Sequence, residues 1–429
     1  MIYGGDEVSA LVLDIGTSST RFGYAGDDTP RCIVPTSYGY IPRASTSIGE
    51  DGNPVETQSR DLYVGENGVN RWRPDMEVGN PMSDSLIYDF SAVSNIIEHG
   101  YSKVLETQSE NHPIFVTEQA WNTPANRERM AEIMFEQFNV PAFYIANNAV
   151  LSAFASGRGT ALIVDIGKAT ASVTPVVEGF VLRKGIMHST IPSLVYSSAH
   201  SILAHGDQTR PGVDLLPYQL IDKKQPVDPN MPPRCVTRAD RVEKTTASWR
   251  NWALQGEVEE WLAACGGVLS KGWSEEAAQA WARKSYEFPS GFNSSFGSER
   301  FVPGDIYFTN QHLPPLPQGQ IHPETLPQLL LSSLRATEPD LRPNLFNNVV
   351  LTGGGSLLPG MGDRLSYELQ NIAGGQKVRL HVSGNSLERR YGAWLGGSIL
   401  GSLGTFHQLW ISKQEWEEHG KAIVGSRCK

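Results

Sequence analysis

One short pattern occurs twice in this chain and constrains its fold more than any other feature. The segment Leu11-Val12-Leu13-Asp14-Ile15-Gly16-Thr17 is matched by Leu162-Ile163-Val164-Asp165-Ile166-Gly167-Lys168. Each copy is an apolar run that ends in Asp-x-Gly, and a second β-prone run follows each, at residues 20–24 and 171–176. The pattern predicts two β-hairpins with glycine-containing turns, one in each of two similar lobes. Ligands often bind in the cleft between two such lobes.

Length and charge agree with this interpretation and exclude some functions. The chain has 429 residues, which is long for one compact core. Its net charge of −10 repels nucleic acid, so contact with DNA would need a basic patch or a basic partner. Cys32, Cys235, Cys265 and Cys428 lack zinc or CxxC spacing, and we expect reduced, intracellular thiols. We find no secretory signal, no membrane span and no basic nuclear-localisation cluster.

Local patterns predict the remaining elements. Thr123-Pro124 is typical of a helix start, and apolar residues at helical spacing follow it. Residues 248–282 should be largely helical, and their five tryptophans should mainly pack in the core. Residues 36–79 and 205–240 lack periodicity and are expected to be exposed loops, with the second the better candidate for disorder.

The repeated turns have the composition of a phosphate site. Small turn residues leave backbone N–H groups open to an anion, and Thr17 and Ser18 add hydroxyl donors beside Gly16. Arg21 can place a guanidinium on a phosphate. In the second copy, Gly167, Lys168 and Ala169 would contribute further N–H groups and an ammonium.

The two aspartates of the repeat suggest a cation near those phosphates. Asp14 and Asp165 would flank the same anion, and two carboxylates suit a hydrated Mg²⁺ that keeps most of its waters. A single Asp-x-Gly turn is usually only a hairpin, and Lys168 alone would be a solvated surface lysine. The prediction therefore depends on the two turns occurring together.

A third glycine-rich turn completes the candidate site. The buried-type strand at residues 349–351 is followed by Thr352-Gly353-Gly354-Gly355, where backbone can approach a flat ligand closely. Leu357 and Leu358 could form the wall of a purine pocket. Taken alone, this segment would be an ordinary strand–helix turn.

These turns, in this order, resemble the superfamily of actins, heat-shock chaperone ATPases and sugar kinases. Residues 394–415, 122–136 and 154–158 are similar to actin, while residues 3–8 and 285–291 resemble the actin-related protein 4 family. The resemblance implies an α/β, two-lobed, actin-like fold with duplicated ribonuclease-H-like cores. It also implies four subdomains: residues 1–35, 80–155 and 392–429; residues 36–79; residues 156–191 and 311–391; and residues 192–310 with an insertion.

The resemblance further implies a function. That family supplies non-catalytic, ATP-binding scaffold subunits to nuclear chromatin-remodelling and histone-acetyltransferase complexes, where they pair with nuclear actin on a long partner helix. We therefore expect ATP with Mg²⁺ or Ca²⁺, and either cation would be held through water by Asp14 and Asp165. Gly354, Leu357 and Leu358 match the nucleoside wall, Gly353 also belongs to the nucleotide site, and Arg390 matches a lysine beside the base. Histones or nucleosomal DNA are further possible contacts within a complex, and no membrane is expected.

Several positions depart from actin where hydrolysis would occur. Asn148 stands where actin has the glutamine that positions the attacking water, and Ser172 replaces a nearby histidine. Arg21 and Lys168 replace a lysine and an acidic residue, and Ser193 replaces a glycine near the nucleoside. A side chain shortened by one methylene loses near-attack geometry, so we expect slow or absent hydrolysis.

The resemblance also assigns a surface groove for a partner helix. It comprises Phe154, Gly157, Arg158, Leu400, Leu403, Thr405 and Leu409, although its leucines could instead be core residues. The polar segment 37–60 lacks an apolar plug, so no homopolymer is expected. An ATP-hydrolysing filament protein remains the main alternative. A sugar kinase would need a catalytic aspartate that we cannot identify, and a chaperone would need a peptide-binding domain.

Overall fold

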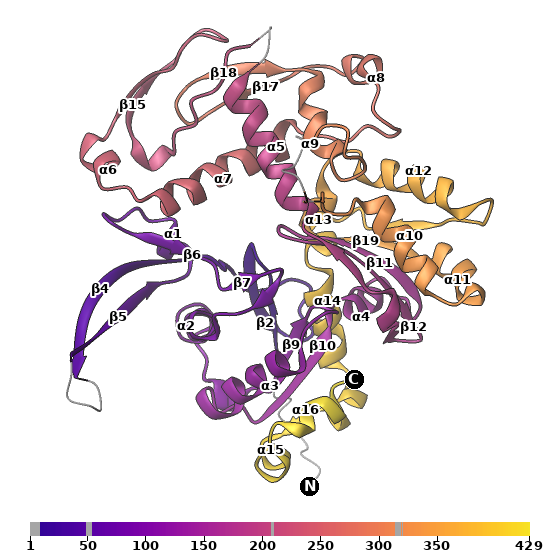
Figure 1. Cartoon of the computed structure of the whole chain (residues 1–429). Coiled ribbons are helices and arrows are strands. Elements are labelled where there is room, and N and C mark those ends of the chain that lie inside the picture. Colours follow the sequence, from indigo (N-terminus) through magenta and orange to yellow (C-terminus); the bar gives the residue numbers. More distant parts are fainter. Residues whose placement is uncertain (1–8, 49–53, 207–209, 314–318, 320) are drawn as a thin grey trace.

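The computed structural model describes residues 9–48, 54–206, 210–313, 319 and 321–429. The chain forms two lobes, each built around one mixed β-sheet with helices against it (Figure 1). No helix in these ranges is long and apolar enough to cross a membrane.

The sheet of the first lobe contains the first copy of the repeat. Its strands lie in the order β21-β10-β9-β1-β2-β3. Their bounds are β1 (Leu11–Ile15), β2 (Ser19–Tyr24), β3 (Cys32–Pro35), β9 (Ile114–Glu118), β10 (Ala142–Asn147) and β21 (Ile411–Ser412). All five residues of β1 are buried, as expected for a strand covered on both faces. The predicted hairpin is confirmed, since β1 and β2 pair antiparallel from Leu11↔Tyr24 to Ile15↔Thr20.

The sheet of the second lobe contains the second copy. It has the order β13-β12-β11-β19-β20, and β14 also pairs with β12. The bounds are β11 (Ala161–Ile166), β12 (Ala171–Val177), β13 (Phe180–Val181), β14 (Met187–Ser189), β19 (Val349–Thr352) and β20 (Leu380–Val382). Here too the predicted hairpin is confirmed, with β11 and β12 paired from Ala161↔Val176 to Ile166↔Ala171.

The two sheets share one pattern of pairing around these hairpins. The first hairpin strand, β1 or β11, pairs in parallel on its other edge with β9 or β19. A further parallel strand, β10 or β20, lies beyond. This repetition confirms the α/β actin-like fold with duplicated ribonuclease-H-like cores. The proposed limits of the four subdomains stay a prediction.

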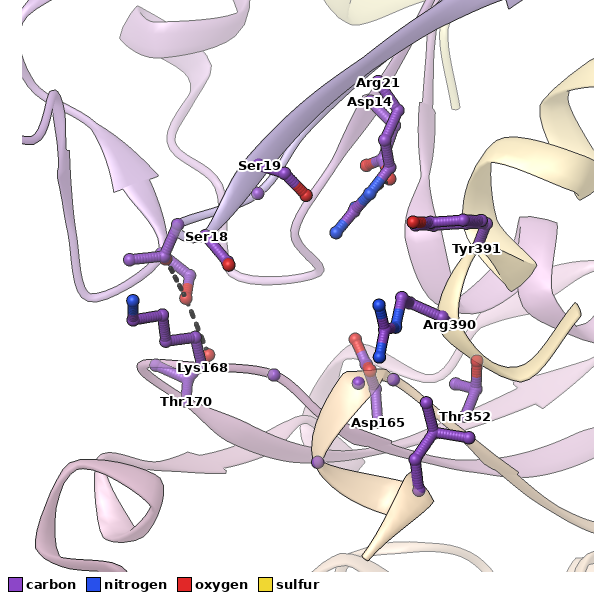
Figure 2. A pocket seen from close by; sticks show the side chains of 18 of the residues that line it. Asp14, Ser18, Ser19, Arg21, Asp165, Lys168, Thr170, Thr352, Arg390 and Tyr391 are labelled. Carbon is purple, nitrogen blue, oxygen red and sulfur yellow. Dashed lines mark hydrogen bonds and ion pairs between the residues drawn. The ribbon is translucent and has the colours of Figure 1, made fainter. Parts of the chain in front are cut away.

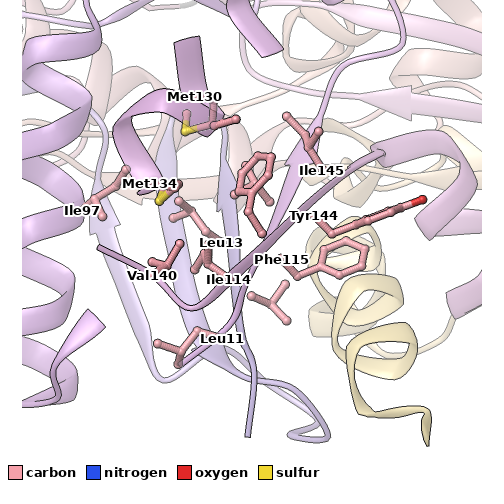
Figure 3. Close-up of a cluster of buried hydrophobic side chains, with 14 of the residues drawn as sticks. Leu11, Leu13, Ile97, Ile114, Phe115, Met130, Met134, Val140, Tyr144 and Ile145 are labelled. Carbon is pink, nitrogen blue, oxygen red and sulfur yellow. The ribbon is translucent and has the colours of Figure 1, made fainter. Parts of the chain in front are cut away.

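Helices of the first lobe cover its sheet with residues from both ends of the chain. They are α2 (Phe90–His99), α3 (Pro124–Glu132), α4 (Asn148–Ala155), α14 (Gly392–Ser402), α15 (Lys413–His419) and α16 (Ala422–Arg427). As predicted, α3 begins at Thr123, whose hydroxyl accepts from Asn126 N at 3.2 Å. Met130 and Met134 pack against strand residues such as Leu13 (Figure 3). This core joins residues 10–151 with residues 391–428.

The second lobe has its own core, drawn from residues 162–373. Its helices are α5 (Ile191–His205), α7 (Ala247–Cys265), α8 (Glu275–Gln279), α9 (Val302–Asp305), α10 (Leu326–Ala336), α11 (Arg342–Phe346), α12 (Met361–Ala373) and α13 (Ser386–Arg390). The prediction of a largely helical segment over 248–282 is only partly correct, because α7 ends before Gly266 and α8 is short. Trp249 and Trp261 are fully buried, whereas Trp281 is exposed.

The prediction of a loop over 36–79 is wrong. This segment forms β4 (Tyr38–Ile48), β5 (Pro54–Tyr63), α1 (Glu66–Val69) and β6 (Glu77–Gly79). The first two strands pair continuously from Gly39↔Tyr63 to Ile48↔Pro54, so the backbone satisfies its own hydrogen bonds despite the polar composition. Residues 49–53, part of the segment expected to lack an apolar plug, lie outside the described residues. The short strands β7 (Met82–Ser83) and β8 (Leu86–Ile87) follow.

The expectation of a loop over 205–240, with possible disorder, is also wrong for its described part. The segment contains β15 (Ile221–Gln225) and β16 (Arg234–Thr237), and α6 (Ala239–Glu243) begins at its end. A second hairpin, β17 (Lys284–Glu287) and β18 (Asn293–Phe296), lies beside it. Leu220 is fully buried and anchors the segment in an apolar cluster with Met76 and Trp249. The many prolines and charges of the segment suggested a loop, and its sequence does not reveal the packing of Leu220 on distant residues.

Candidate functional site

A cavity of about 940 Å³ lies between the lobes, at the turns of the two repeated hairpins (Figure 2). Most of the residues predicted for nucleotide binding line it. They are Asp14, Gly16, Thr17, Ser18, Arg21, Asp165, Gly167, Lys168, Gly353, Gly354, Leu357, Leu358 and Arg390. Ala169 belongs to the second turn but does not line the cavity, so only its backbone could face a ligand.

The two hairpin turns have equivalent geometry. In the first, Gly16 N donates to Ser19 O at 3.1 Å, and in the second, Gly167 N donates to Thr170 O at 2.9 Å. The two central residues of each turn therefore correspond, so that Lys168 occupies the place of Thr17. The sequence repeat has become a pair of matching turns that line one cavity from opposite lobes.

Hydrogen bonds between three hydroxyl groups connect these turns across the cleft. Ser85 Oγ lies 2.8 Å from Thr170 Oγ1 and 3.4 Å from Thr17 Oγ1 (Figure 2). Ser85 sits in the turn between β7 and β8, where both it and Asp84 adopt left-handed backbone angles, with φ of 57° and 48°. Asp84 in turn accepts from His188 Nε2 at 3.0 Å, and His188 stacks on Trp121 with ring centroids 4.2 Å apart. The lobes thus touch directly beside the cavity.

Asp14 is fully engaged by neighbours in its own lobe. Its Oδ2 accepts from Arg21 Nη1 at 2.5 Å and its Oδ1 accepts from the Thr117 hydroxyl at 2.6 Å. The Arg21 guanidinium also lies 5.1 Å from the ring centre of Tyr391. Arg21, predicted as a phosphate ligand, therefore lines the cavity as the ion-pair partner of Asp14.

Asp165 lies opposite, half-buried at the cavity wall, in a site that tolerates little change. Burial raises the pKa of Asp165 to about 6; the Asp14 charge adds to this shift and Arg21 opposes it. Gly353, with φ of 90°, packs so closely that a Cβ there would meet Asp165 Oδ1 at 2.2 Å. A glycine is required at this contact because both the backbone angle and the space exclude a side chain.

Asn148, in the position expected to have lost its catalytic role, is tied to neighbouring side chains. Its Nδ2 donates to Gln119 Oε1 at 2.8 Å and to Asp165 Oδ2 at 3.4 Å. Ser172 is buried on β12, in register with Asp165 and His188, and does not line the cavity. Ser193, on α5, is exposed and likewise does not line it.

Lys168 reaches from the second turn to the helix that covers the cleft. Its Nζ lies 2.7 Å from Glu259 Oε1 of α7, and both side chains are less than one-third exposed. Figure 2 shows Lys168 below Ser18, across the space between the two turns. A cation is therefore held where the two turns face each other.

The glycine-rich turn forms the other end of the cavity. Gly353 N and the Thr352 hydroxyl both donate to Arg389 O, at 2.8 and 2.9 Å, which fixes the turn against α13. A Cβ on Gly354 would meet no atom within 4 Å, so open space adjoins its backbone. Leu357 and Leu358 provide apolar surface, and Arg390 provides charge. This combination fits a flat apolar base.

The complete donor set fits a nucleotide. Hydroxyl groups, backbone turns, Arg21 and Lys168 lie at the end formed by the hairpins, and apolar side chains, open glycine backbone and Arg390 lie at the other. The fit to a metal rests on Asp14 and Asp165 alone: among the described residues, no three His, Cys, Asp or Glu side chains are grouped to hold an ion.

Sequence reasoning missed several residues that line the cavity. Ser19 and Thr170 occupy the fourth positions of the repeated turns, and Tyr391 follows Arg390, so local pattern could have found these three. Ser85, Gln119, Tyr196, Glu259 and Tyr307 come from other elements. No local signal marks those five, since tertiary packing brings them to the site.

The residues predicted for a partner groove divide into exposed and packed groups. Phe154, Leu403 and Leu409 are 37%, 45% and 42% exposed, and Thr405 is also exposed. Leu400 instead packs against the core of the first lobe, in agreement with the alternative reading for that leucine. Arg158 Nη2 lies 2.7 Å from His381 Nδ1, and Gly157 adopts φ of 70°. Helices α4 and α14, which carry Phe154 and Leu400 of this set, pack against each other.

The repeated sheets and the nucleotide-shaped cavity between them define a two-lobed protein of the actin type. The family model described as Actin matches residues 5–429. The chain therefore belongs to the actin family.

Its relatives are more specific. Curated proteins named actin-related protein 4 are 33% identical in Mycosarcoma maydis, 37% in Yarrowia lipolytica and 35% in Schizosaccharomyces pombe. The comparisons cover 100%, 98% and 100% of this chain, and 99%, 95% and 99% of those proteins. The resemblance to actin-related protein 4 that the sequence motifs suggested is confirmed.

Proposed function

We propose that this chain is a non-catalytic, ATP-binding scaffold subunit of nuclear chromatin-remodelling and histone-acetyltransferase complexes. The observation that carries the proposal is the cavity formed by two matching turns in a chain similar along its full length to actin-related protein 4. In this view, bound nucleotide joins the lobes, and the joined lobes present a surface to partners.

ATP is the proposed ligand because donors and apolar surface are separated along the cavity. The turns at Gly16 and Gly167 would hold the phosphates, while Leu357, Leu358 and Arg390 would surround the base. A ligand that binds only the folded state stabilises it by mass action. Mg²⁺ or Ca²⁺, if bound, would neutralise phosphate charge near Asp14 and Asp165 through its waters.

Hydrolysis is proposed to be slow or absent. Asn148 uses its amide donors on Gln119 and Asp165. A side chain held in this way is poorly placed to orient water against the terminal phosphate. Ser172 is buried outside the cavity and supplies no replacement.

The proposed partners are nuclear actin and a long helix of a remodeller or scaffold subunit. Phe154, Leu403 and Leu409 expose apolar surface on neighbouring elements, which suits the apolar face of an amphipathic helix. Histones or nucleosomal DNA would be contacted within the complex, since the net charge of −10 disfavours independent DNA binding. A nuclear location follows from this role.

Two measurements on the native chain test the proposal. First, nucleotide released by denaturing purified protein should be ATP, near one equivalent. Second, the proteins that co-purify at stoichiometric level should include actin and a chromatin-complex subunit. Purified chain that contains no nucleotide, or that co-purifies with no such partner, would contradict it.

A filament-forming ATPase is the competing function. The described β4–β5 ribbon extends away from the body of the first lobe (Figure 1). Such a projecting ribbon offers a surface for contact between subunits of a filament. Sedimentation with ATP and Mg²⁺ separates the two functions. The scaffold should stay in the supernatant and release little phosphate, whereas a filament protein would pellet and release phosphate steadily.

A further inference from the structure

We propose that Lys168 supplies, from the second turn, the positive charge that anchors the phosphates, so that the chain retains ATP without a divalent cation. This inference rests on the proposed nucleotide function and concerns how the same site works. Lys168 would then not only line the cavity but also take over part of the role of a metal ion at the phosphates.

The position of Lys168 within the repeated turns is the first argument. The matching hydrogen bonds of the two turns make Lys168 the counterpart of Thr17. Ser85 links Thr17 to Thr170 through two hydroxyl contacts, which brings the turns close to one another. A phosphate that contacts both turns would therefore lie beside the Lys168 ammonium.

The state of the carboxylates is the second argument. Both oxygens of Asp14 already accept hydrogen bonds, from Arg21 at 2.5 Å and from Thr117 at 2.6 Å. Arg21 also compensates the Asp14 charge, which weakens the attraction of this carboxylate for a hydrated cation. Asp165 Oδ2 faces the Asn148 amide at 3.4 Å. Asp14 is thus engaged through both oxygens before any cation arrives, and Asp165 through one long contact.

The immediate surroundings of Lys168 give the third argument. Glu259 holds its Nζ at 2.7 Å and keeps the ammonium over the cleft. Glu259 balances the charge of the ammonium until a phosphate arrives. With phosphates bound, the ammonium would supply beside them part of the positive charge that a divalent ion otherwise provides.

The test compares nucleotide retention with and without divalent cations. Full-length protein is purified, treated with excess EDTA, passed through a desalting column and denatured, and the released nucleotide is quantified by ion-exchange chromatography. ATP affinity is then measured in EDTA and in MgCl₂. The wild-type chain should retain most of its ATP in EDTA, with affinities in the two media within about threefold of each other.

The variant Lys168→Gln should lose the retention in EDTA and should bind ATP at least tenfold more weakly there than in MgCl₂. Glu259→Gln removes the partner of Lys168 but keeps the ammonium, so it should retain ATP in EDTA as the wild type does. Lys223→Gln, at an exposed site on β15, controls for loss of one positive charge. Circular dichroism and thermal unfolding in MgCl₂ establish that each variant is folded.

Each outcome is decisive. If wild type and Lys168→Gln lose ATP equally in EDTA while both bind it in MgCl₂, the inference is wrong and the nucleotide function stands. Equal retention by both proteins in EDTA also overturns the assignment to Lys168. If the wild type binds no nucleotide in either medium, the proposed function fails and this inference fails with it.

Discussion

Trp249 of the second lobe donates its indole N–H to the carbonyl of Val69 in the first lobe, at 3.2 Å. Around this bond, Trp72 Nε1 donates to the Thr245 hydroxyl at 2.9 Å and Val78 N donates to the Ser248 hydroxyl at 2.9 Å. Met76, Leu220 and Trp249 form a buried apolar cluster at the same place. The lobes are therefore joined at the outer end of the cleft as well as beside its floor, where His188 meets Asp84.

Loosening the outer contact should speed the exchange of nucleotide. Trp249→Phe keeps most of the apolar surface but removes the donor to Val69, and one such hydrogen bond contributes about 1 kcal/mol. We expect a roughly fivefold faster release of a fluorescent ATP analogue, measured by stopped flow, with a small change in unfolding free energy. Trp273→Phe, at a half-buried site within the second lobe, should leave the release rate unchanged. Equal rates for Trp249→Phe and wild type would contradict this role.

Two neighbouring glycines should respond differently to the same substitution. Gly353→Ala places a Cβ 2.2 Å from Asp165 Oδ1 at φ of 90°, so we expect destabilisation of about 3 kcal/mol or more. Gly354→Ala meets no protein atom within 4 Å and should leave the unfolding temperature of the nucleotide-free chain nearly unchanged. Its methyl group would enter the space assigned to the nucleotide and should weaken ATP binding. Thermal unfolding and nucleotide content distinguish these effects, and equal destabilisation by both substitutions would refute the assignment.

Glu257 should make the stability of the second lobe depend on pH. It is 6% exposed on α7, neither carboxylate oxygen has a hydrogen-bond partner among the described residues, and burial raises its pKa to about 8, with Glu260 adding to the shift. The pKa of Glu257 is therefore higher in the folded chain than in the unfolded chain. For this reason the stabilisation linked to its protonation is complete below about pH 4.5 and is lost as pH rises through about 8.

Replacing this carboxyl with a neutral amide should remove the pH dependence. Between pH 5 and pH 8, the unfolding free energy of the wild type should fall by roughly 2–4 kcal/mol more than that of Glu257→Gln. Denaturant titrations at several pH values measure the difference. Glu276→Gln, at an exposed position on α8, should keep the wild-type slope. Parallel slopes for wild type and Glu257→Gln would show that Glu257 is not the responsible group.

Lengthening Asn148 tests the proposal that this residue makes hydrolysis slow. Asn148→Gln restores the reach of the amide, and we expect phosphate release to rise by up to about tenfold, because Gln119 still competes for that amide. Asn148→Ala removes the amide and should not raise the rate. Single-turnover phosphate release measures both variants. Rapid release by the wild type itself would overturn the non-catalytic proposal.

The exposed groove residues should affect binding without affecting stability. Leu403 is 45% exposed, so Leu403→Asp should change the unfolding free energy by about 0.5 kcal/mol or less. In an apolar interface the introduced charge should weaken capture of actin or the partner helix at least tenfold. Ile321→Asp introduces the same charge at a site that is 91% exposed, and capture should be unaffected. Pull-down of purified components gives the comparison.

The sequence could predict the repeated hairpins because each copy carries its own local signal. Apolar runs ending in Asp-x-Gly specify a strand and a tight turn wherever they occur, and Thr123-Pro124 specifies a helix start in the same way. Thirteen of the fourteen predicted nucleotide-binding residues line the cavity, and eight of them lie in these two hairpins.

The elements that were mispredicted depend on distant partners. The polar ribbon of β4 and β5 is stabilised by backbone pairing, which composition does not reveal. Leu220 orders residues near 220 by packing on Met76 and Trp249, far away in sequence. Ser85 and Glu259 reach the cavity only after their elements have packed, so no local pattern could have identified them.

The division of the two cores along the chain has a consequence for synthesis. The core and sheet of the second lobe are complete at residue 382, whereas those of the first lobe also need residues 391–428. Trp394, which is fully buried and donates to Val12 O at 3.1 Å, belongs to that last portion. On a ribosome, β1 and β2 emerge long before residues 391–428, so their sheet is fully covered only after that later segment has been made. The sheet that is made earlier therefore finishes folding after the lobe that is made later, and its strands stay partly uncovered in the meantime.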